Sequence, residues 1–251
     1  MRHFLFIDNG NTAIKGLLTD EFYRPVYHFT TTLDEFSAEK NKILSFGQIP
    51  GGLYASVGKL NETLRDDFEN TFHLQSFGHQ THIPLKMGYE TPETLGTDRL
   101  ATAIGGFSLY PDVDLLVLDF GTCLKFDFVS KEGKYEGGSI SPGLNMRFKA
   151  MHTFTAKLPL LSMPEKFPAQ PIGRSTADSM QHGVLLGMLA EADGMVGFYR
   201  QTYPDLKVLV TGGDAEVFEG HLKNAIFVRQ NLALLGLAET MKYNANTPND
   251  K

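Results

Sequence analysis

Eight residues near the start of the chain carry groups that could hold a nucleotide phosphate. In order they are Asp8, Asn9, Gly10, Asn11, Thr12, Ala13, Ile14 and Lys15. Backbone N–H groups of a glycine turn bind oxyanions, the Asp8 carboxylate can hold Mg²⁺ through water, and the Lys15 ammonium can offset phosphate charge. The common phosphate cradles, G-x-G-x-x-G and the P-loop, are absent from the chain. An ordinary hairpin with a solvated lysine is the alternative interpretation.

Asp98 and Arg99 form a second pair of residues whose side chains could carry chemistry, at the point where a loop is expected to enter a helix. A carboxylate at this position gains from the helix N-terminus, and so does a bound anion. Arginine suits a carboxylate ligand, because its paired donors match the two carboxylate oxygens. A plain charge at the start of the helix, with the arginine pointing elsewhere, is the alternative interpretation.

The segment around Asp8 recurs about half a chain later. Phe4–Thr12 and Leu115–Thr122 each contain four apolar residues, then Asp, any residue, Gly, and a Thr within two positions. Asp119 lies 111 residues after Asp8, and a second apolar strand pattern follows each copy. Two similar lobes that face each other across a cleft are the simplest architecture for such a repeat.

Short apolar runs alternate with helical patterns along the chain, which predicts an α/β fold. We expect strands at Phe4–Asp8, Ala13–Leu18, Leu53–Val57, Phe72–Phe77, Leu115–Asp119, Leu124–Val129 and Val208–Val210. We expect helices at Asp98–Leu109, Thr176–Tyr203 and Leu232–Met241. The turn Asn9-Gly10-Asn11 suits positive φ, and the glycine-rich run Gly137–Gly143 is expected to be a plain turn.

The helix expected at Thr176–Tyr203 has the clearest pattern. Its apolar stripe comprises Val184, Met188, Ala192, Val196 and Tyr199. Ser175 or Thr176 is expected to cap its N-terminus. Gly183 and Gly187 weaken the helix intrinsically, so we expect another backbone to pack closely against them.

Composition indicates an ordinary folded protein and excludes several functional classes. The chain has 251 residues, of which 42% are hydrophobic and 21% charged, with a net charge of −6. The acidic balance argues against a nucleic-acid binder, and the single cysteine, Cys123, allows neither an internal disulfide nor a cysteine cluster for zinc. The sequence contains no signal-peptide core and no run of about 18 apolar residues, so we expect a cytoplasmic protein with no membrane partner.

Six segments, in order along the chain, resemble the motifs of type III pantothenate kinases. They are Asp8-Asn9-Gly10-Asn11-Thr12-Ala13-Ile14-Lys15, Tyr89-Glu90-Thr91-Pro92-Glu93-Thr94-Leu95-Gly96-Thr97-Asp98-Arg99, Asp119-Phe120-Gly121-Thr122, Gly137–Met146, Gly173-Arg174-Ser175-Thr176 and Thr211-Gly212-Gly213-Asp214. Each segment alone is unspecific, whereas the ordered set over positions 8–214 is specific.

The resemblance implies a fold and an activity. The fold would consist of two similar ribonuclease-H-like lobes, of the actin, sugar-kinase and Hsp70 type, with a central cleft. We expect an N-terminal lobe at 1–112 joined by a closing helix at 230–243, a C-terminal lobe at 113–229 and a frayed tail at 244–251. The activity would be the first step of coenzyme A biosynthesis, in which ATP phosphorylates pantothenate to 4'-phosphopantothenate. The resemblance also implies a homodimer and a requirement for K⁺ or NH₄⁺.

The resemblance assigns roles to residues of this chain. Asp8 to Lys15 and Thr122 would contact ATP. Asp98 would be the general base. Asp119 would bind the monovalent cation. Pantothenate would be held by Tyr89, Gly96, Thr97, Asp98, Arg99 and Thr176.

Lys125 marks a departure from the family pattern. The second motif usually continues G-T-A-x-T, but here it reads Gly121-Thr122-Cys123-Leu124-Lys125. Period-two alternation places Lys125 on the strand face opposite Leu124 and Phe126, which is more simply the solvated face. We therefore expect Lys125 to face solvent and activity to rise with added K⁺. The alternative is that its ammonium reaches Asp119 and that activity is nearly indifferent to K⁺.

Two other functions are compatible with such a sequence. One is a phosphotransferase of the same superfamily that acts on another substrate. The other is a non-enzymatic relative, since members of this family have been described as accessory factors for transcription. The presence of Lys15, Asp98 and Asp119 favours an enzyme, because a regulator has no need of them.

Overall fold

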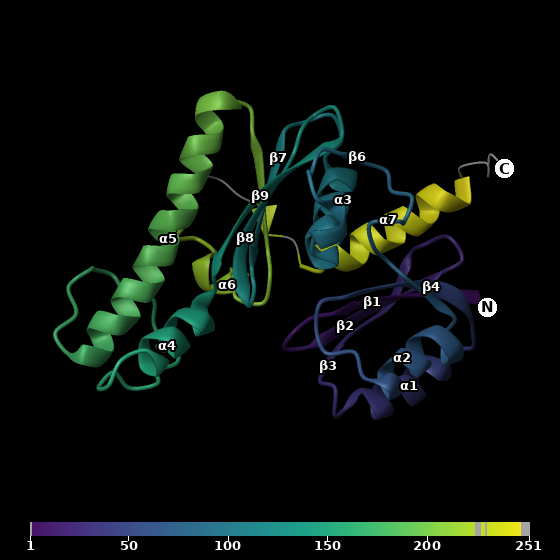
Figure 1. The fold of residues 1–251 in the computed structure, drawn as a ribbon, viewed down its shortest axis with the longest axis horizontal. Helices are drawn as coiled ribbons and strands as arrows, with labels where there is room; N and C mark the ends of the chain where they lie inside the picture. Colours follow the sequence, from purple (N-terminus) through teal and green to yellow (C-terminus); the bar gives the residue numbers. More distant parts are fainter. Residues whose placement is uncertain (1, 224–226, 229, 247–251) are drawn as a thin grey trace. The chain divides into compact units, whose positions relative to one another are not determined.

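The computed structural model describes residues 2–223, 227–228 and 230–246 (Figure 1). Its strands are β1 (Arg2–Asn9), β2 (Ile14–Asp20), β3 (Pro25–Thr31), β4 (Gln48–Ser56), β5 (Leu74–Ser76), β6 (Lys86–Met87), β7 (Leu115–Phe120), β8 (Cys123–Val129), β9 (Lys134–Pro142), β10 (Lys207–Thr211) and β11 (Phe227–Val228). Its α-helices are α1 (Phe36–Leu44), α2 (Glu62–Asp66), α3 (Thr97–Leu109), α4 (Leu144–Thr153), α5 (Thr176–Thr202), α6 (Ala215–Phe218) and α7 (Leu232–Asn246). A π-helical turn spans Asp67–Thr71 and a 3₁₀ turn spans Pro92–Thr94. The predicted α/β class is confirmed.

The chain divides into two compact units. Unit 1 comprises the described residues within 1–111, 133–136 and 231–251, and unit 2 comprises those within 112–132 and 137–230. Helix α7 belongs to unit 1 and continues to Asn246, three residues into the expected tail. The rest of that tail, residues 247–251, lies outside the described residues.

The two sheets share one topology, which confirms the repeat and the two similar lobes predicted from it. The first sheet has the order β3-β2-β1-β4-β5, and the second contains the order β9-β8-β7-β10-β11, with β6 beyond β9. In the first sheet β1 is antiparallel to β2 and parallel to β4. In the second sheet β7 is antiparallel to β8 and parallel to β10. The two copies of the repeat therefore occupy equivalent positions, at the ends of β1 and β7.

The sheet of unit 1 is covered by helices on both faces (Figure 1). Phe36 and Ile43 of α1 and Leu64 of α2 are buried in one core cluster with residues of β1 and β2. Helices α3 and α7 pack against each other, and α7 also contacts β1 and β4. Their backbones approach so closely that a Cβ at Gly236 would lie 1.8 Å from the Ala101 carbonyl oxygen. Helix α3, which carries Asp98 and Arg99, is thereby fixed on its sheet.

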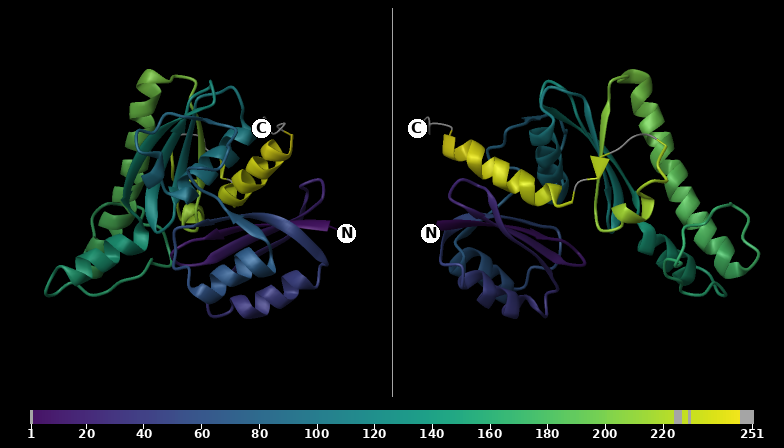
Figure 2. Two further views of the ribbon diagram at one scale, coloured as in Figure 1. Left: turned by 45° about the vertical axis from the view of Figure 1, so that its right-hand side comes forward. Right: turned by 180° about the vertical axis from the view of Figure 1, so that it is seen from behind.

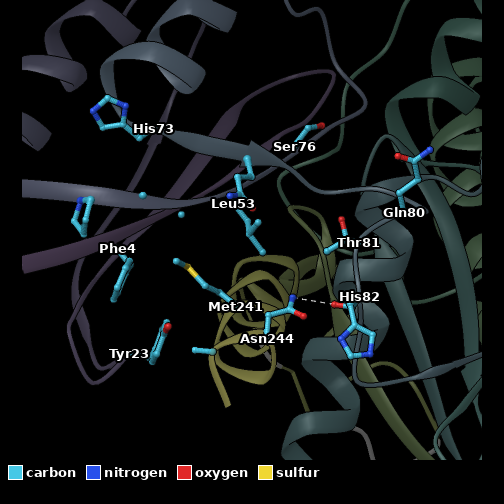
Figure 3. Close-up of a pocket in the computed structure, with 15 residues that line it drawn as sticks. Phe4, Tyr23, Leu53, His73, Ser76, Gln80, Thr81, His82, Met241 and Asn244 are labelled. Carbon is cyan, nitrogen blue, oxygen red and sulfur yellow. Dashed lines mark hydrogen bonds between the residues drawn. The ribbon is translucent and has the colours of Figure 1, made fainter. Parts of the chain in front are cut away.

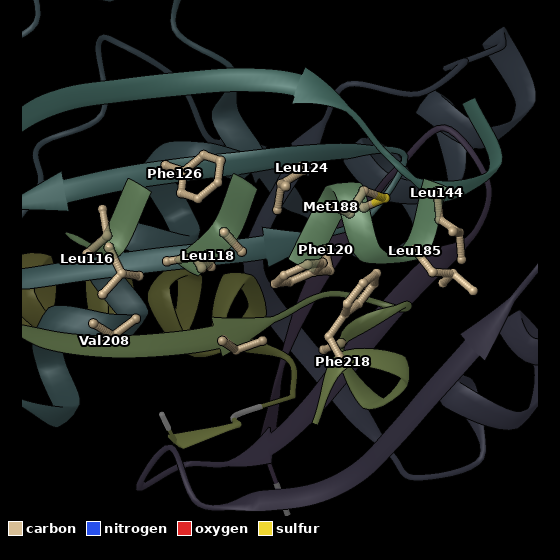
Figure 4. Packing of buried hydrophobic residues seen from close by; sticks show 14 of the residues in the cluster. Leu116, Leu118, Phe120, Leu124, Phe126, Leu144, Leu185, Met188, Val208 and Phe218 are labelled. Atoms are coloured by element: carbon tan, nitrogen blue, oxygen red, sulfur yellow. The ribbon is translucent and has the colours of Figure 1, made fainter. Parts of the chain in front are cut away.

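The core of unit 2 lies between its sheet and helices α4 and α5 (Figures 2 and 4). The predicted stripe of α5 is confirmed, since its buried members include Val184, Met188, Ala192 and Val196. The predicted cap is confirmed as well, because the Ser175 hydroxyl accepts a hydrogen bond from the Asp178 N–H at 3.1 Å.

Several local predictions were wrong. The run at Gly137–Gly143 is mostly strand, because β9 extends to Pro142. None of Asn9, Gly10 and Asn11 has positive φ. The connection between β1 and β2 is instead a four-residue turn in which the Gly10 N–H donates to the Ala13 carbonyl at 3.1 Å. Helices α1, α2, α4 and α6 were not predicted. Each spans ten residues or fewer, which leaves few turns in which a helical repeat can show.

No helix among the residues that the structure describes is long and apolar enough to cross a membrane.

Candidate active site

The β1–β2 hairpin holds Asp8 and Lys15 directly opposite each other. Opposed residues of an antiparallel pair project from the same face of the sheet, so the carboxylate and the ammonium lie on one face. Both side chains are half-buried, whereas Asn11 and Thr12 in the turn are exposed. The predicted segment thus presents one carboxylate and one ammonium group beside an exposed turn.

Asn9 fixes the end of this hairpin. Its buried side-chain amide donates to the Ser56 hydroxyl at 2.9 Å and to the Lys59 carbonyl at 3.2 Å. The Asn9 carbonyl in turn accepts from the N–H groups of Val57 and Gly58, at 3.1 and 2.9 Å. These bonds tie the turn to the end of β4, and Asn9 therefore positions the hairpin through its own side chain.

The start of α3 brings Tyr89, Asp98 and Arg99 together. The Asp98 Oδ1 atom accepts a hydrogen bond from the Arg99 N–H at 2.9 Å, inside the first turn of the helix. Arg99 is only 5% exposed, and its guanidinium carbon lies 5.8 Å from the centre of the Tyr89 ring. A guanidinium at this distance from an aromatic ring makes a cation–π contact. Three of the predicted substrate residues therefore form one cluster.

Gly96 and Thr97 complete this cluster. Gly96 occupies the cap position of α3 and supplies no side-chain cap. The Thr97 hydroxyl oxygen is buried and has no hydrogen-bond partner within the described part of the chain. A buried hydroxyl without a partner carries an energetic cost, so this atom is a candidate donor or acceptor for a ligand.

Asp119 and Lys125 form an ion pair at the corresponding hairpin of unit 2. They are opposed across β7 and β8, and Lys125 Nζ lies 2.7 Å from Asp119 Oδ2. Their side chains are 13% and 17% exposed for lysine and aspartate. The expectation that Lys125 faces solvent was therefore wrong. The predicted alternation of side chains along β8 was correct. Lys125, however, lies on the same face of the sheet as Asp119, and both side chains are mostly buried.

Asp214 is a second carboxylate beside Asp119. Burial, and after it the negative charge of Asp119, raises the pKa of the Asp214 carboxyl above its ordinary value. Its backbone N–H donates to the Phe120 carbonyl at 2.9 Å, which holds the turn after β10 against the end of β7. The motif Thr211-Gly212-Gly213-Asp214 was found from the sequence, but no role had been assigned to Asp214.

Gly212 makes this approach sterically feasible. Its φ is +104°, and a Cβ there would lie 2.3 Å from the Phe120 carbonyl oxygen and 2.6 Å from Asp119 Oδ1. A side chain at this position would therefore meet both unfavourable backbone geometry and a backbone clash.

The remaining predicted residues of unit 2 are exposed. Thr122 lies in the turn between β7 and β8, and Thr176 is the first residue of α5. The structure thus gives three local groups, Asp8 with Lys15, Asp98 with Arg99 and Tyr89, and Asp119 with Lys125 and Asp214.

A cavity of about 660 Å³ in unit 1 contains none of the predicted site residues (Figure 3). It is lined by residues from β1, β4, β5 and α7, among them Phe4 and Met241, and by His73 just before β5. Tyr23 also lines it and stacks on Phe4 with ring centres 5.2 Å apart. Burial raises the pKa of the Tyr23 phenol. The cavity is therefore separate from the motifs that carry the chemistry.

A comparison with family models assigns the chain. The model for type III pantothenate kinase matches residues 4–197, which is more than three quarters of the sequence. The chain belongs to the type III pantothenate kinase family. This confirms the resemblance inferred from the six ordered motifs.

Individual type III pantothenate kinases are similar over nearly the whole length. The one from Flavobacterium johnsoniae is 37% identical over 95% of this chain and 97% of its own. The one from Phocaeicola vulgatus is 38% identical over 96% of this chain and 98% of its own.

A solved structure of low sequence identity has the same fold as this chain. The activator of 2-hydroxyisocaproyl-CoA dehydratase from Clostridium difficile, solved with ADPNP, covers 99% of this chain and 99% of its own, with a TM-score of 0.53 at 13% identity. The fold is therefore that of the actin, sugar-kinase and Hsp70 type, as predicted.

Proposed function

We propose that this chain transfers the γ-phosphoryl group of ATP to pantothenate, with 4'-phosphopantothenate and ADP as products. This is the first step of coenzyme A biosynthesis, which we expect to take place in the cytoplasm. Family membership supports the reaction class. The observation that carries the assignment to these residues is the cluster of Asp98, Arg99 and Tyr89 at the start of α3.

Arg99 and its neighbours suit the acid end of pantothenate. A guanidinium binds a carboxylate through two parallel donors, and the Tyr89 ring restricts its orientation. The buried Thr97 hydroxyl and the residues Gly96 and Thr176 complete the proposed substrate contacts. Arg99 is almost fully buried, so its charge is screened less by water than a surface charge.

Asp98 is the proposed general base. A carboxylate is far too weak a base to deprotonate an alcohol fully before the reaction. In a loose phosphoryl-transfer transition state, Asp98 instead orients the hydroxyl and accepts its proton late. Its position in the first turn of α3 adds the helix N-terminus to the local positive charge.

The two equivalent hairpins are the proposed ATP contacts. Lys15 would offset phosphate charge, and the turns at residues 9–14 and at Thr122 would present backbone N–H groups. Among the described residues, no group of three or more His, Cys, Asp or Glu side chains could hold a metal. Mg²⁺ usually binds through one or two carboxylates together with phosphates and water, so the single carboxylate of Asp8 fits it. Bound there, Mg²⁺ would neutralise phosphate charge.

The monovalent cation implied at Asp119 fits the residues less well. One oxygen of Asp119 is already bonded to the Lys125 ammonium at 2.7 Å. A second cation at the same carboxylate would be repelled by that ammonium. A K⁺ or NH₄⁺ ion at Asp119 is implied by the resemblance alone, and no step of the proposed reaction requires it.

Helix α5 is the proposed contact of a homodimer. Gly183, Gly187, Gly194 and Gly197 form an exposed row, and a Cβ at any of them would meet nothing within 4 Å in the described part of the chain. No backbone within the described part of this chain packs on Gly183 or Gly187, so the backbone expected there stays a prediction that a second copy would satisfy. Phe198, beside this row, is 67% exposed. A second copy of α5 would cover both the glycine row and Phe198.

A coupled assay of ADP release, with and without pantothenate, tests the proposed reaction. We expect ADP release to depend on pantothenate, and mass spectrometry to show one phosphate added per pantothenate consumed. ADP release only with another alcohol would indicate a different substrate. No ADP release with any acceptor would support the non-enzymatic alternative.

A further inference from the structure

The position of Lys125 is set by strand register. Because β7 and β8 are antiparallel and Asp119 is opposed to Lys125, both side chains must leave the sheet on the same face. Their neighbours along the two strands, Leu118, Phe120 and Leu124, point into the core on the other face (Figure 4). A shift of the register by one residue would bury Lys125 in that core, so the pairing is strongly specified.

Burial of the Asp119 carboxylate favours a positive group beside it. A carboxylate that is mostly buried is costly unless a positive group or several hydrogen-bond donors compensate it. Lys125 supplies the positive group from within the chain, at 2.7 Å. An ammonium group carries the charge of a K⁺ ion and is similar to it in size. Since it is covalently tethered, its local concentration does not depend on the salt in solution.

The pair lies where two glycine turns meet the Asp119 carboxylate. A Cβ at Gly121 would lie 3.3 Å from Asp119 Oδ1, and one at Gly212 would lie 2.6 Å from it. The first of these turns carries Thr122, a proposed contact of ATP. A change in the charge next to Asp119 would therefore act directly beside both turns.

We propose that the Lys125 ammonium takes the place of a monovalent cation at Asp119, so that nucleotide binding and phosphoryl transfer by this chain need neither K⁺ nor NH₄⁺. This inference rests on the proposed function. Lys125 acts through Asp119 and the glycine turns, and it is thus a positioning residue.

Nucleotide affinity in two salts tests the inference independently of turnover. Binding of ADP with Mg²⁺ to the full chain would be measured by calorimetry in KCl and in tetramethylammonium chloride at equal ionic strength. The wild-type dissociation constant is expected to agree between the two salts within about twofold. An increase in wild-type affinity of about tenfold or more with K⁺ would overturn the proposal.

The variant Lys125→Thr removes the ammonium and leaves room and an oxygen ligand for an ion. We expect ADP to bind it about tenfold more weakly in tetramethylammonium, and K⁺ or NH₄⁺ to restore affinity whereas Li⁺ does not. Lys131→Thr, at an exposed lysine of the next turn, is the matched control and should behave as wild type in every salt. A folded Lys125→Thr protein with wild-type affinity in both salts would contradict the inference.

Two further outcomes are distinguishable. If Lys125→Thr does not fold, as judged by circular dichroism, the wild-type comparison of the two salts decides by itself. If wild type binds ADP equally in both salts but phosphorylates no pantothenate, the proposed function fails while the role of Lys125 in nucleotide binding stands.

Discussion

The guanidinium carbon of Arg99 lies 5.8 Å from the centre of the Tyr89 ring, although the two residues come from different elements. Tyr89 precedes the 3₁₀ turn at Pro92–Thr94, and Arg99 is in the first helical turn of α3. The ring therefore limits the orientations of a buried cation that is proposed to bind the substrate carboxylate.

This relationship predicts the effect of Arg99→Lys. Lysine keeps the charge but lacks the planar pair of donors, so we expect KM for pantothenate to rise about tenfold with a smaller change in kcat. Tyr89→Phe, which keeps the ring, should raise KM less than Tyr89→Leu. Steady-state kinetics on the three variants would check this, and an unchanged KM in Arg99→Lys would remove Arg99 from substrate binding.

Asp98→Asn should keep the fold but lose at least ~10²-fold in kcat, which is the usual scale for a general base. The asparagine oxygen can still accept the Arg99 N–H bond, so the start of α3 should be preserved. Glu93→Gln, an exposed acid in the adjacent 3₁₀ turn, is the control and should turn over normally. Near-wild-type turnover of Asp98→Asn would exclude it as the base.

Gly212→Ala should destabilise the protein by about 1–3 kcal/mol, because it forces a side chain into positive φ and against the Phe120 carbonyl. The adjacent Gly213→Ala is a matched control, since a Cβ there meets nothing within 4 Å in the described residues. It should change stability by no more than about 0.5 kcal/mol. Urea unfolding of both variants would measure the difference, and equal effects would refute the steric argument.

Asp214→Asn should raise the melting temperature at pH 8. The pKa of Asp214 is raised in the folded state, so its ionised form costs stability at all pH values above that folded pKa. Asparagine removes this cost, and the advantage should shrink as the pH falls through the folded pKa and wild type becomes protonated. Asp205→Asn, at an exposed acid, should show no such pH-dependent gain. A variant no more stable than wild type at pH 8 would contradict the prediction.

Light scattering should give twice the chain mass at micromolar concentration, and Gly187→Glu should reduce it to one chain. A glutamate on the exposed glycine row of α5 places bulk and charge in the proposed dimer contact, while a helix tolerates glutamate better than glycine. Gly78→Glu, at an open glycine outside α5, should leave the mass doubled. A fully active wild-type monomer would rule the dimer out.

Local sequence patterns determined much of this protein. The apolar runs of β7 and β8 and the 3.6-residue stripe of α5 depend on neighbouring residues, and each element was predicted with nearly its observed bounds. The Ser175 cap is equally local, because the hydroxyl bonds an N–H only three residues away. The repeated Asp-x-Gly segments, together with the ordered motifs, also determined the family and the two similar lobes.

Only the tertiary structure decided what each strand face meets. Alternation places Lys125 on one face of β8, but whether that face is solvated depends on cross-strand register and on what covers the sheet. The register brings Asp119 opposite Lys125. The same fold brings Asp214, which is 95 residues after Asp119 in the sequence, against the end of β7. Charge and burial at such positions arise from contacts between distant segments, and no local pattern in the sequence encodes them.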